Sequence, residues 1–336
     1  MSEVSGQKIK EMVVQTLGNI WKEKTSSLWI TMIMLFLILF FVLYYVYVTV
    51  KKQEYNCKVI ATSPIYDIVA IPTDVKSLPL NKVSVKTAHN CCCSGDFKND
   101  YVDKCALMNC AKNGVRALDF TLYSLHGEPV ISASTLLSKK YKEMYNSLPF
   151  TKTMTQVKQI FMFDSANCRN INDPLFLIFR IQSANLKLYD KIGDTLQSVF
   201  GFANSSGDKI YKKKEIETEL VSNLMGKVII FVDITGLTGY ESSSLSNITA
   251  LVFGTMTNQI IRETDAYDML ETEQKPNETN INILFPDYNP KSTNYDFNTV
   301  GLKQQFQFIG MNFQMNDAYL DAYNGIFKSS IIKSIL

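Results

Sequence analysis

Hydrophobic residues form one long, uninterrupted run near the start of the chain. Residues 28–50 carry no charge, and a helix of that length rises roughly 35 Å, more than the ~30 Å hydrocarbon core of a bilayer. Trp29 lies near one end of the run, and Tyr44 and Tyr45 lie near the other, where aromatic rings favour the headgroup region. A buried core helix is rarely apolar on every face for this length. The pattern predicts a transmembrane helix, assigned to residues 27–50.

The segments on either side of this run have a different pattern. Before the run, apolar side chains recur at helical spacing, at Ile9, Met12, Val13, Leu17, Ile20 and Trp21. This spacing predicts an amphipathic segment over residues 1–26, which either lies on the membrane surface or packs against a partner protein. After the run we expect a juxtamembrane linker over residues 51–78.

The rest of the chain alternates short apolar, β-branched runs with helical or loop stretches. The runs are residues 82–88, 115–122, 129–134, 175–182, 227–234, 248–254, 281–286 and 306–314. Several are apolar throughout, as strands buried on both faces should be. Strands that alternate with helices are typical of parallel sheets with crossover connections. Eight such units predict an α/β fold, a TIM-type (β/α)8 barrel over residues 79–336, with its chemistry at the C-terminal ends of the strands.

Charge and acceptor motifs bear on partners and topology. The chain has 34 Lys and Arg against 32 Asp and Glu, a net charge of +2, which argues against a nucleic-acid partner. Lysines flank the apolar run on both sides and favour a cytosolic N-terminus only weakly. Three N-glycosylation patterns follow, at Asn204-Ser205-Ser206, Asn247-Ile248-Thr249 and Asn277-Glu278-Thr279. These patterns, although frequent by chance, favour a lumenal or external barrel domain on a single-pass membrane protein.

Four stretches, in order along the chain, match the motifs of one known family. They are "PLNKVSVKTAHNCCCSGD" (79–96), "NGVRALDFT" (113–121), "EPVISASTLLSKK" (128–140) and "STNYDFNTVGLKQQFQFIGMNFQMNDAYLDAYNGIF" (292–327). They resemble, respectively, P-L-x-x-Y-x-I-x-S-S-H-N-T-Y-L-x-G-D, G-x-R-x-x-E-x-D, E-P-I-I-Y-H-G-H-T-L-T-S-K, and S-S-N-Y-N-P followed by A-L-N-F-Q-T. Together they make the chain similar to the phosphoinositide-specific phospholipases C. The terminal "SIIKSIL" is expected to pair with the first strand.

The resemblance implies a set of catalytic residues. In this family the inositol 2-hydroxyl attacks the neighbouring phosphodiester, one histidine stabilises the developing charge, and a second protonates the leaving alkoxide. A calcium ion, where present, lowers the pKa of the hydroxyl and neutralises the phosphate. By resemblance His89 matches the first histidine, and Asn90 and Asp119 match two calcium ligands. Arg180 stands where the family has another acidic ligand.

Several departures from the family pattern predict that this chemistry is eroded. Thr121 replaces a carboxylate ligand, and Ala133-Ser134 replaces the H-G-H that holds the second histidine. The other histidine of the chain, His126, lies in a turn at the wrong end of that strand. We therefore expect calcium to bind weakly if at all, and Arg180 to hold an anionic phosphate in its place. Loss of the general acid removes roughly 10² to 10⁴ in rate.

Three further residues are candidates for substrate binding. Tyr295 matches the aromatic residue that packs on the inositol ring, and Lys291 lies close to a phosphate-binding position of the family. Ser134 lies where the second histidine would stand. The ordinary alternatives are that Tyr295 is a packing residue and that Lys291 is a solvated loop residue.

Cysteine usage allows several interpretations. The chain has seven cysteines: Cys57, Cys91, Cys92, Cys93, Cys105, Cys110 and Cys168. Their clustering, together with the glycosylation patterns, favours disulfides in an oxidising compartment, with one thiol left over. Buried unpaired thiols and S-acylation are the alternatives. A zinc site is disfavoured because clean C-x-x-C pairs are lacking.

Three functions remain open from the sequence. The first is a membrane-anchored relative of phospholipase C with an eroded site, which binds phosphoinositides or phosphate, or holds structure, without a cofactor. The second is an active, metal-independent phosphodiesterase that acts on inositol phospholipids through His89, Asp119 and Arg180. The third is a purely structural membrane component of an envelope or virion. In each case the expected partner is the lipid bilayer.

Overall fold

The structure is a computed structural model, and it divides the chain into two compact units, residues 1–54 and 55–336. It describes residues 3–66, 68–136, 141–201, 208–274, 276, 279–328, 330 and 332–335. The two units are described separately below.

The N-terminal unit is helical throughout its described length. It lies within α1 (Glu3–Ala61), which carries the predicted apolar run. The most apolar stretch of this helix has a mean hydropathy of 2.6 and none of it is buried, so by length and composition it can cross a membrane. Inside the run the Thr31 and Thr49 hydroxyls donate to carbonyl oxygens one turn earlier, which satisfies these polar groups within the helix. The amphipathic segment, the predicted span and the start of the expected linker therefore lie in one helix.

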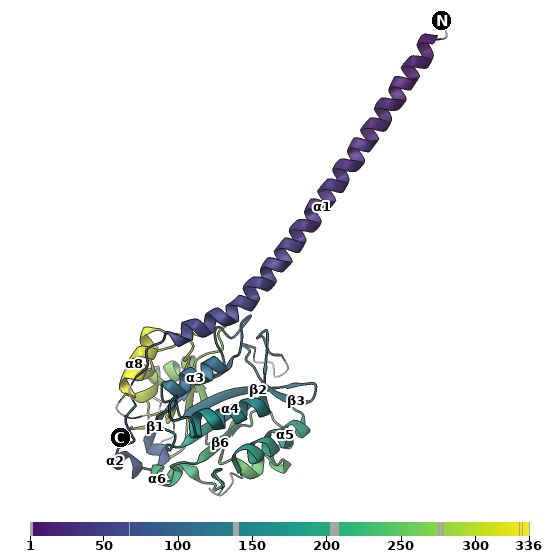
Figure 1. The fold of residues 1–336 in the computed structure, drawn as a ribbon. Helices are drawn as coiled ribbons and strands as arrows, with labels where there is room; N and C mark the ends of the chain where they lie inside the picture. Colours follow the sequence, from purple (N-terminus) through teal and green to yellow (C-terminus); the bar gives the residue numbers. More distant parts are fainter. Residues whose placement is uncertain are drawn as a thin grey trace. The chain divides into compact units, whose positions relative to one another are not determined.

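The second unit is built around eight parallel strands in the part of the chain that the structure describes. They are β1 (Val83–Ala88), β2 (Ala117–Leu125), β5 (Leu175–Ile181), β6 (Val228–Asp233), β7 (Leu251–Phe253), β8 (Ile260–Arg262), β9 (Ile283–Phe285) and β10 (Phe308–Met311). Their order is β7-β6-β5-β2-β1-β10-β9-β8. The ring is thus nearly closed, with β7 and β8 at its two ends, and the predicted barrel is confirmed (Figure 1).

One predicted strand is wrong and another was missed. Residues 129–134 form β3 (Glu128–Ile131), which pairs antiparallel with β2 and with β4 (Leu148–Pro149) outside the parallel ring. The turn between β2 and β3 is His126-Gly127, and both residues have positive φ, as a tight two-residue hairpin turn requires. The eighth barrel strand is β8 instead. It follows β7 with no helix between them, so the alternation of strand and helix that marked other strands is missing there.

The C-terminal residues pair with the first strand, as predicted. β11 (Ile332–Ser334) runs antiparallel to β1, with Val83 opposite Ser334 and Val85 opposite Ile332. Ile332 is buried among the apolar side chains inside the barrel.

Apolar side chains fill the barrel interior. Phe176, Phe231 and Phe308 meet there with ring centroids 5.1–5.7 Å apart, and all three are fully buried. The interior is therefore a packed core rather than a pore, as in closed eight-stranded barrels.

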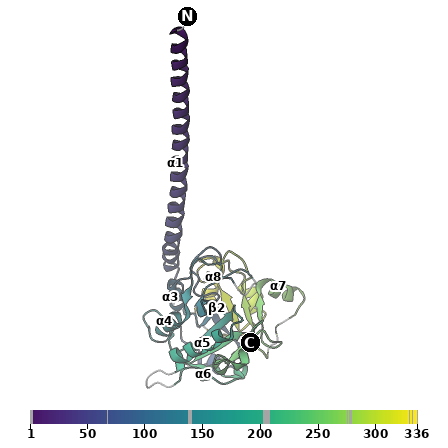
Figure 2. The same cartoon turned by 90° about the vertical axis from the view of Figure 1, so that its right-hand side faces the viewer.

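Helices cover the outside of the strands (Figure 2). They are α2 (Thr73–Lys76), α3 (Lys104–Lys112), α4 (Phe150–Met162), α5 (Leu186–Leu196), α6 (Val221–Leu224), α7 (Glu263–Glu271) and α8 (Ala318–Ile326). α3 begins after Asp103, whose side chain accepts a hydrogen bond from the Cys105 backbone N–H. Such an N-cap satisfies one of the free amides of the first turn. α4 and α5 bury one face each, for example Met154 and Ile192.

The expected linker over residues 51–78 is structured. Its residues from Tyr55 onward belong to the barrel unit, and Ile71 and Val75 are buried in the barrel core. Ile60, in the last turn of α1, is also buried. Apolar side chains at these positions give the segment its own packing, so little of it behaves as a free tether.

Candidate functional site

Four of the predicted site residues come together where β1 and β5 end, beside the first half of β2. His89 and Asn90 follow directly after β1. Asp119 lies in β2, and Arg180 is the penultimate residue of β5. All four side chains are buried. The parallel pairing of these strands, with β2 between β1 and β5, brings together residues 91 positions apart.

Arg180 and Asp119 form a buried ion pair with two hydrogen bonds. Nε donates to Oδ1 at 2.8 Å, and Nη2 donates to Oδ2 at 2.7 Å. Burial would raise the pKa of Asp119, but the Arg180 guanidinium outweighs it and lowers this pKa below its usual value. Burial opposes the charged guanidinium too, and Asp119 outweighs it and raises the pKa of Arg180. Both groups are therefore ionised at neutral pH.

His89 is held as a neutral imidazole. Its Nδ1 lies 3.0 Å from Asn312 Oδ1, and the Asn312 side-chain amide donates to the Thr293 carbonyl, which turns Oδ1 toward the ring. Nδ1 therefore carries the proton, and Nε2 accepts, with Arg180 Nη2 at 3.3 Å. Burial is the largest cause that lowers the pKa of His89 to about 3, followed by Arg180. The ring packs against Phe285 at a centroid distance of 4.9 Å.

Asn90 connects these side chains. It has φ 43, a left-handed conformation that is uncommon outside glycine. Its backbone N–H donates to Asp119 Oδ2 at 2.8 Å. Its side-chain Oδ1 accepts from Arg180 Nη2 at 2.9 Å and from Thr121 Oγ1 at 2.8 Å. Thr121, which stands where the family has a carboxylate, thus serves to orient Asn90.

The arrangement does not fit a calcium ion. Calcium takes six to eight oxygen ligands. Here Asn90 Oδ1 and both oxygens of Asp119 accept hydrogen bonds from Arg180, whose positive charge opposes a second cation. The oxygens that the resemblance assigned to calcium serve the guanidinium instead.

Ser134 lies in a separate hydrogen-bond group. Its Oγ donates to Glu143 Oε2 at 3.2 Å, and the Thr135 backbone N–H donates to the same oxygen at 2.8 Å. Lys98 forms an ion pair with Glu143 at 2.8 Å. Burial would raise the pKa of Glu143, but these donors together lower it to about 2. Among the described contacts, Ser134 therefore supports a loop and does not join His89 or Arg180.

Tyr295 and Lys291 also lie apart from the four clustered residues. Tyr295 is buried, and its hydroxyl donates to the Gly310 carbonyl at 3.2 Å and lies 3.4 Å from that of Leu284. Lys291 is exposed in the loop after β9. His126, the other histidine, is exposed in the β2–β3 turn.

Two residues near the strand ends were not singled out from the sequence. Asn312, which orients His89, follows β10 inside the stretch that resembles A-L-N-F-Q-T, so the motif itself held the signal. Arg262 is the last residue of β8. Its guanidinium lies 3.8 Å from the centre of the Tyr288 ring, and its Nη1 donates to the Pro286 carbonyl at 2.7 Å. Residues 260–262 were not among the predicted strand runs, so Arg262 was not expected at the strand ends.

The cysteine cluster is not a disulfide knot. The one disulfide among the seven cysteines joins Cys57 and Cys105, whereas Cys91, Cys92, Cys93, Cys110 and Cys168 are free and buried. Burial raises the pKa of the Cys91 and Cys93 thiols well above its usual value, so they remain protonated. The alternative of small buried hydrophobic thiols is therefore the correct one for this cluster.

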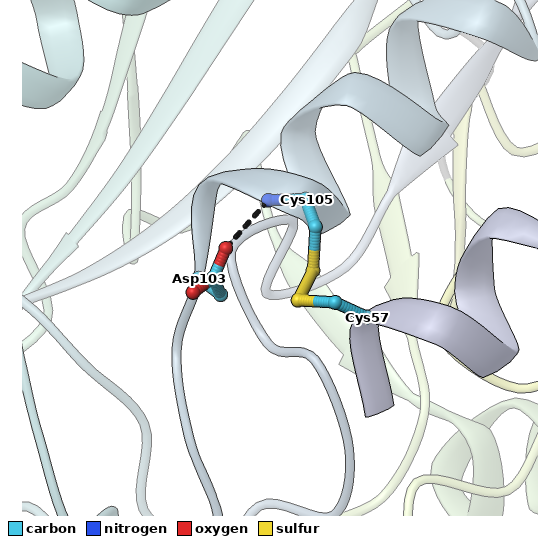
Figure 3. A group of neighbouring side chains, drawn as sticks. All are labelled: Cys57, Asp103 and Cys105. Atoms are coloured by element: carbon cyan, nitrogen blue, oxygen red, sulfur yellow. Dashed lines mark hydrogen bonds between the residues drawn. A yellow bond between two sulfur atoms is a disulfide. The ribbon is translucent and has the colours of Figure 1, made fainter. Parts of the chain in front are cut away.

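Figure 3 shows the surroundings of the disulfide. Cys57, Asp103 and Cys105 lie close enough together to suggest a metal site. However, both sulfur atoms are used in the disulfide, and Asp103 accepts the Cys105 N–H at 2.9 Å (Figure 3). The group is better described as a covalent link between the end of α1 and the start of α3.

Solved structures share this fold. PLC21 of S. officinalis aligns with a TM-score of 0.62 and 15% identity over 78% of this chain and 37% of its own. PLC21 of L. pealei aligns with a TM-score of 0.61 and 15% identity over 77% and 37%. A calcium-dependent phosphoinositol-specific phospholipase C from Pseudomonas sp aligns at 13% identity and a TM-score of 0.47, over 79% and 98%. No protein-family model and no curated protein matches the sequence.

These likenesses define the class of fold. The chain has a phospholipase C-like barrel, divergent in sequence, and it spans little more than a third of the two PLC21 chains. The barrel fold that the four motifs predicted is therefore confirmed. A sequence identity of 15% supports a shared fold only. The activity is therefore inferred from the residues of the site.

Proposed function

We propose that this protein is a membrane-anchored, phospholipase C-like barrel that does not hydrolyse phosphoinositides and acts at the bilayer by binding. The observation that carries the proposal is the buried Arg180–Asp119 pair, with bonds of 2.7 and 2.8 Å. A phospholipase C needs a cation that is available to the substrate phosphate. In this chain the cation at that position is bound to a carboxylate of the protein.

The state of the histidines supports the same conclusion. With a pKa of about 3, His89 is uncharged at neutral pH and offers no positive charge to a developing phosphorane. Ala133 and Ser134 stand where the second histidine is expected, and neither side chain is a general acid near neutral pH. The leaving alkoxide would depart without a proton donor from this strand.

A second candidate keeps the protein an enzyme. Arg180 Nη2 lies 3.3 Å from His89 Nε2, which is a guanidinium beside an imidazole at the strand ends. A metal-independent phosphodiesterase would use this pair, with Arg180 turned from Asp119 toward the phosphate and His89 as the base. The cost of breaking a buried pair, about 3–5 kcal/mol, weighs against it.

Membrane anchoring through α1 and an oxidising environment for the barrel are parts of the proposal. The Cys57–Cys105 disulfide supports a lumenal or external barrel, since disulfides persist in such compartments. Asn247 is exposed and available for glycosylation. Asn204-Ser205-Ser206 and the first two residues of Asn277-Glu278-Thr279 lie outside the described residues. Removal of N-glycans should shift the mass of the wild-type chain and leave that of Asn247→Gln unchanged, if Asn247 is the acceptor.

Hydrolysis of phosphatidylinositol by the full chain tests the proposal. In mixed micelles, with calcium or with a chelator, we expect no release of inositol phosphate above the rate of His89→Ala. Calcium-independent release that His89→Ala abolishes would establish the second candidate. A purely structural role predicts that vesicles with and without phosphoinositide give the same protection of the barrel from protease, whereas a binding role predicts greater protection with phosphoinositide.

A further inference from the structure

A groove lies beside the Cys57–Cys105 disulfide, on the outer face of α3 and away from His89. One wall is formed by the last turn of α1 and the residues after it, including Ile60 and Ile65. The other wall is one face of α3, because positions 104, 105, 108, 109 and 112 recur at helical spacing. The disulfide joins the two walls at one point. The cavity has a volume of about 270 Å³.

The groove combines an apolar floor with positive charge. Ile60, Ile65 and Met108 supply the floor, and Lys104 and Lys112 lie two turns apart along the α3 wall. Neither lysine forms an ion pair with the residues that the structure describes. No carboxylate is among the described residues that line the groove. An occupant that complements these walls has an apolar body and an anionic head.

Membrane lipids lie close to the groove if the uncharged run spans a bilayer. Cys57 follows Val50, the last residue of the uncharged run, by seven positions, and an extended chain of that length spans at most about 25 Å. If the run spans a bilayer, one end of the groove therefore lies within that distance of the membrane surface, whatever the orientation of the barrel. The volume is slightly less than the ~300 Å³ of the smallest pockets that enclose whole ligands. It suits part of a lipid, such as one acyl chain with its headgroup at the lysines.

We propose that this groove binds one anionic phospholipid of the bilayer in which α1 is embedded. The lipid phosphate pairs with one of Lys104 and Lys112, a second anionic group of the headgroup pairs with the other, and an acyl chain lies on Ile60, Ile65 and Met108. The inference rests on the membrane anchoring of the proposed function and places its lipid contact outside the barrel rim. Recognition of a single lipid in a groove does not require a strongly anionic leaflet.

Lipid retention by the full chain tests this assignment. The chain is purified in a non-ionic detergent, mixed with phosphatidylserine or phosphatidylcholine, and analysed by native mass spectrometry. Both lipids carry a phosphate, but only phosphatidylserine adds a carboxylate for the second lysine. We expect one phosphatidylserine per chain, bound at least tenfold more tightly than phosphatidylcholine, since each charged hydrogen bond contributes roughly a factor of ten. Lys104→Ala/Lys112→Ala should lose this preference. Lys152→Ala/Lys187→Ala, which removes two exposed lysines of α4 and α5, should keep it.

A second variant separates shape from charge. Ala61→Trp fills the groove and leaves both lysines in place, so it should also release the lipid while the Cys57–Cys105 bond still forms. Equal retention of both lipids, or retention that neither variant changes, would overturn the assignment. Displacement of the bound mass by 10 mM inorganic phosphate, or a dimer that Ala61→Trp dissociates, would overturn it as well. The readout counts bound lipid, so phospholipase activity in the chain would reject the proposed function and leave this result intact.

Discussion

Arg180 and the Lys104–Lys112 pair are both cations beside apolar side chains, and their surroundings differ in one respect. The Arg180 guanidinium is buried and donates to Asp119 and Asn90 at 2.7–2.9 Å. The two lysines line an open groove and have no described ion pair. Positive charge therefore does not by itself mark a ligand site. An intramolecular partner decides whether the charge stabilises the fold or remains available to another molecule.

The largest expected effect is on the stability of the strand-end site. Arg180→Leu leaves Asp119 buried without its partner and should lower the free energy of unfolding by about 3–5 kcal/mol. Denaturant unfolding of the full chain in detergent measures it. Asp119→Asn/Arg180→Leu, which removes both charges, should recover most of the loss. A loss below about 1 kcal/mol in the single variant would show that the pair is not formed.

The next largest effect on stability is expected from the Cys57–Cys105 disulfide beside the groove. The disulfide joins residues 48 positions apart, and closing such a loop restricts the unfolded chain by about 4 kcal/mol in the chain-entropy model, with 2–4 kcal/mol typical of measured cases. Cys57→Ser/Cys105→Ser should therefore lower the free energy of unfolding by about 2–4 kcal/mol. Cys110→Ser, at a free buried thiol, serves as a comparison that keeps the link. Equal unfolding of wild type with and without reductant would contradict the link.

Because His89 is buried as a neutral imidazole, we expect the free energy of unfolding to depend on pH. Its folded pKa of about 3 lies below the unfolded value near 6.5, so the unfolded chain binds the extra proton as the pH falls. Stability should be full above pH 6.5 and fall by about 2 kcal/mol between pH 6.5 and 5. His89→Gln should flatten this part of the profile, and His126→Gln, at the exposed histidine, should not. A wild-type profile that is flat over this range would contradict the buried neutral imidazole.

Tyr295 and Lys291 give the smallest effects. Tyr295→Phe loses the hydroxyl contacts to the Gly310 and Leu284 carbonyls and should cost about 1 kcal/mol of stability. Lys291→Ala, in an exposed loop, should change stability by less than about 0.5 kcal/mol. Neither variant should alter lipid retention in the groove. A loss of phosphoinositide-dependent vesicle binding in either variant would restore the substrate-binding roles that the resemblance implied.

The barrel could be predicted from the sequence because most of its strands are short runs of hydrophobic, β-branched residues. Runs such as residues 175–182 and 227–234 are mostly apolar, with their charged residues close to the ends, and they became β5 and β6 within one residue at each end. The exceptions are informative. β8 follows β7 without a helix between them, and residues 129–134 have the composition of a barrel strand but follow a two-residue turn, which forces antiparallel pairing.

Of the predicted site residues, four lie together in the structure, whereas Ser134, Lys291 and Tyr295 do not join them. His89, Asn90, Asp119 and Arg180 follow from motif positions, and parallel register brings them together. The sequence did not reveal that Arg180 pairs with Asp119 rather than with a phosphate, because this depends on side-chain rotamers. It also did not reveal Cys57 as the partner of Cys105, since spacing alone does not determine connectivity.

Calcium dependence of thermal unfolding tests most directly whether Arg180 occupies the cation position. If a calcium site were present and the calcium concentration were about one hundred times its dissociation constant, binding would stabilise the folded chain by about 2.7 kcal/mol. We expect millimolar calcium to leave the unfolding midpoint of the full chain unchanged from that in chelator. A saturable rise in the midpoint, abolished by Asp119→Asn, would contradict it.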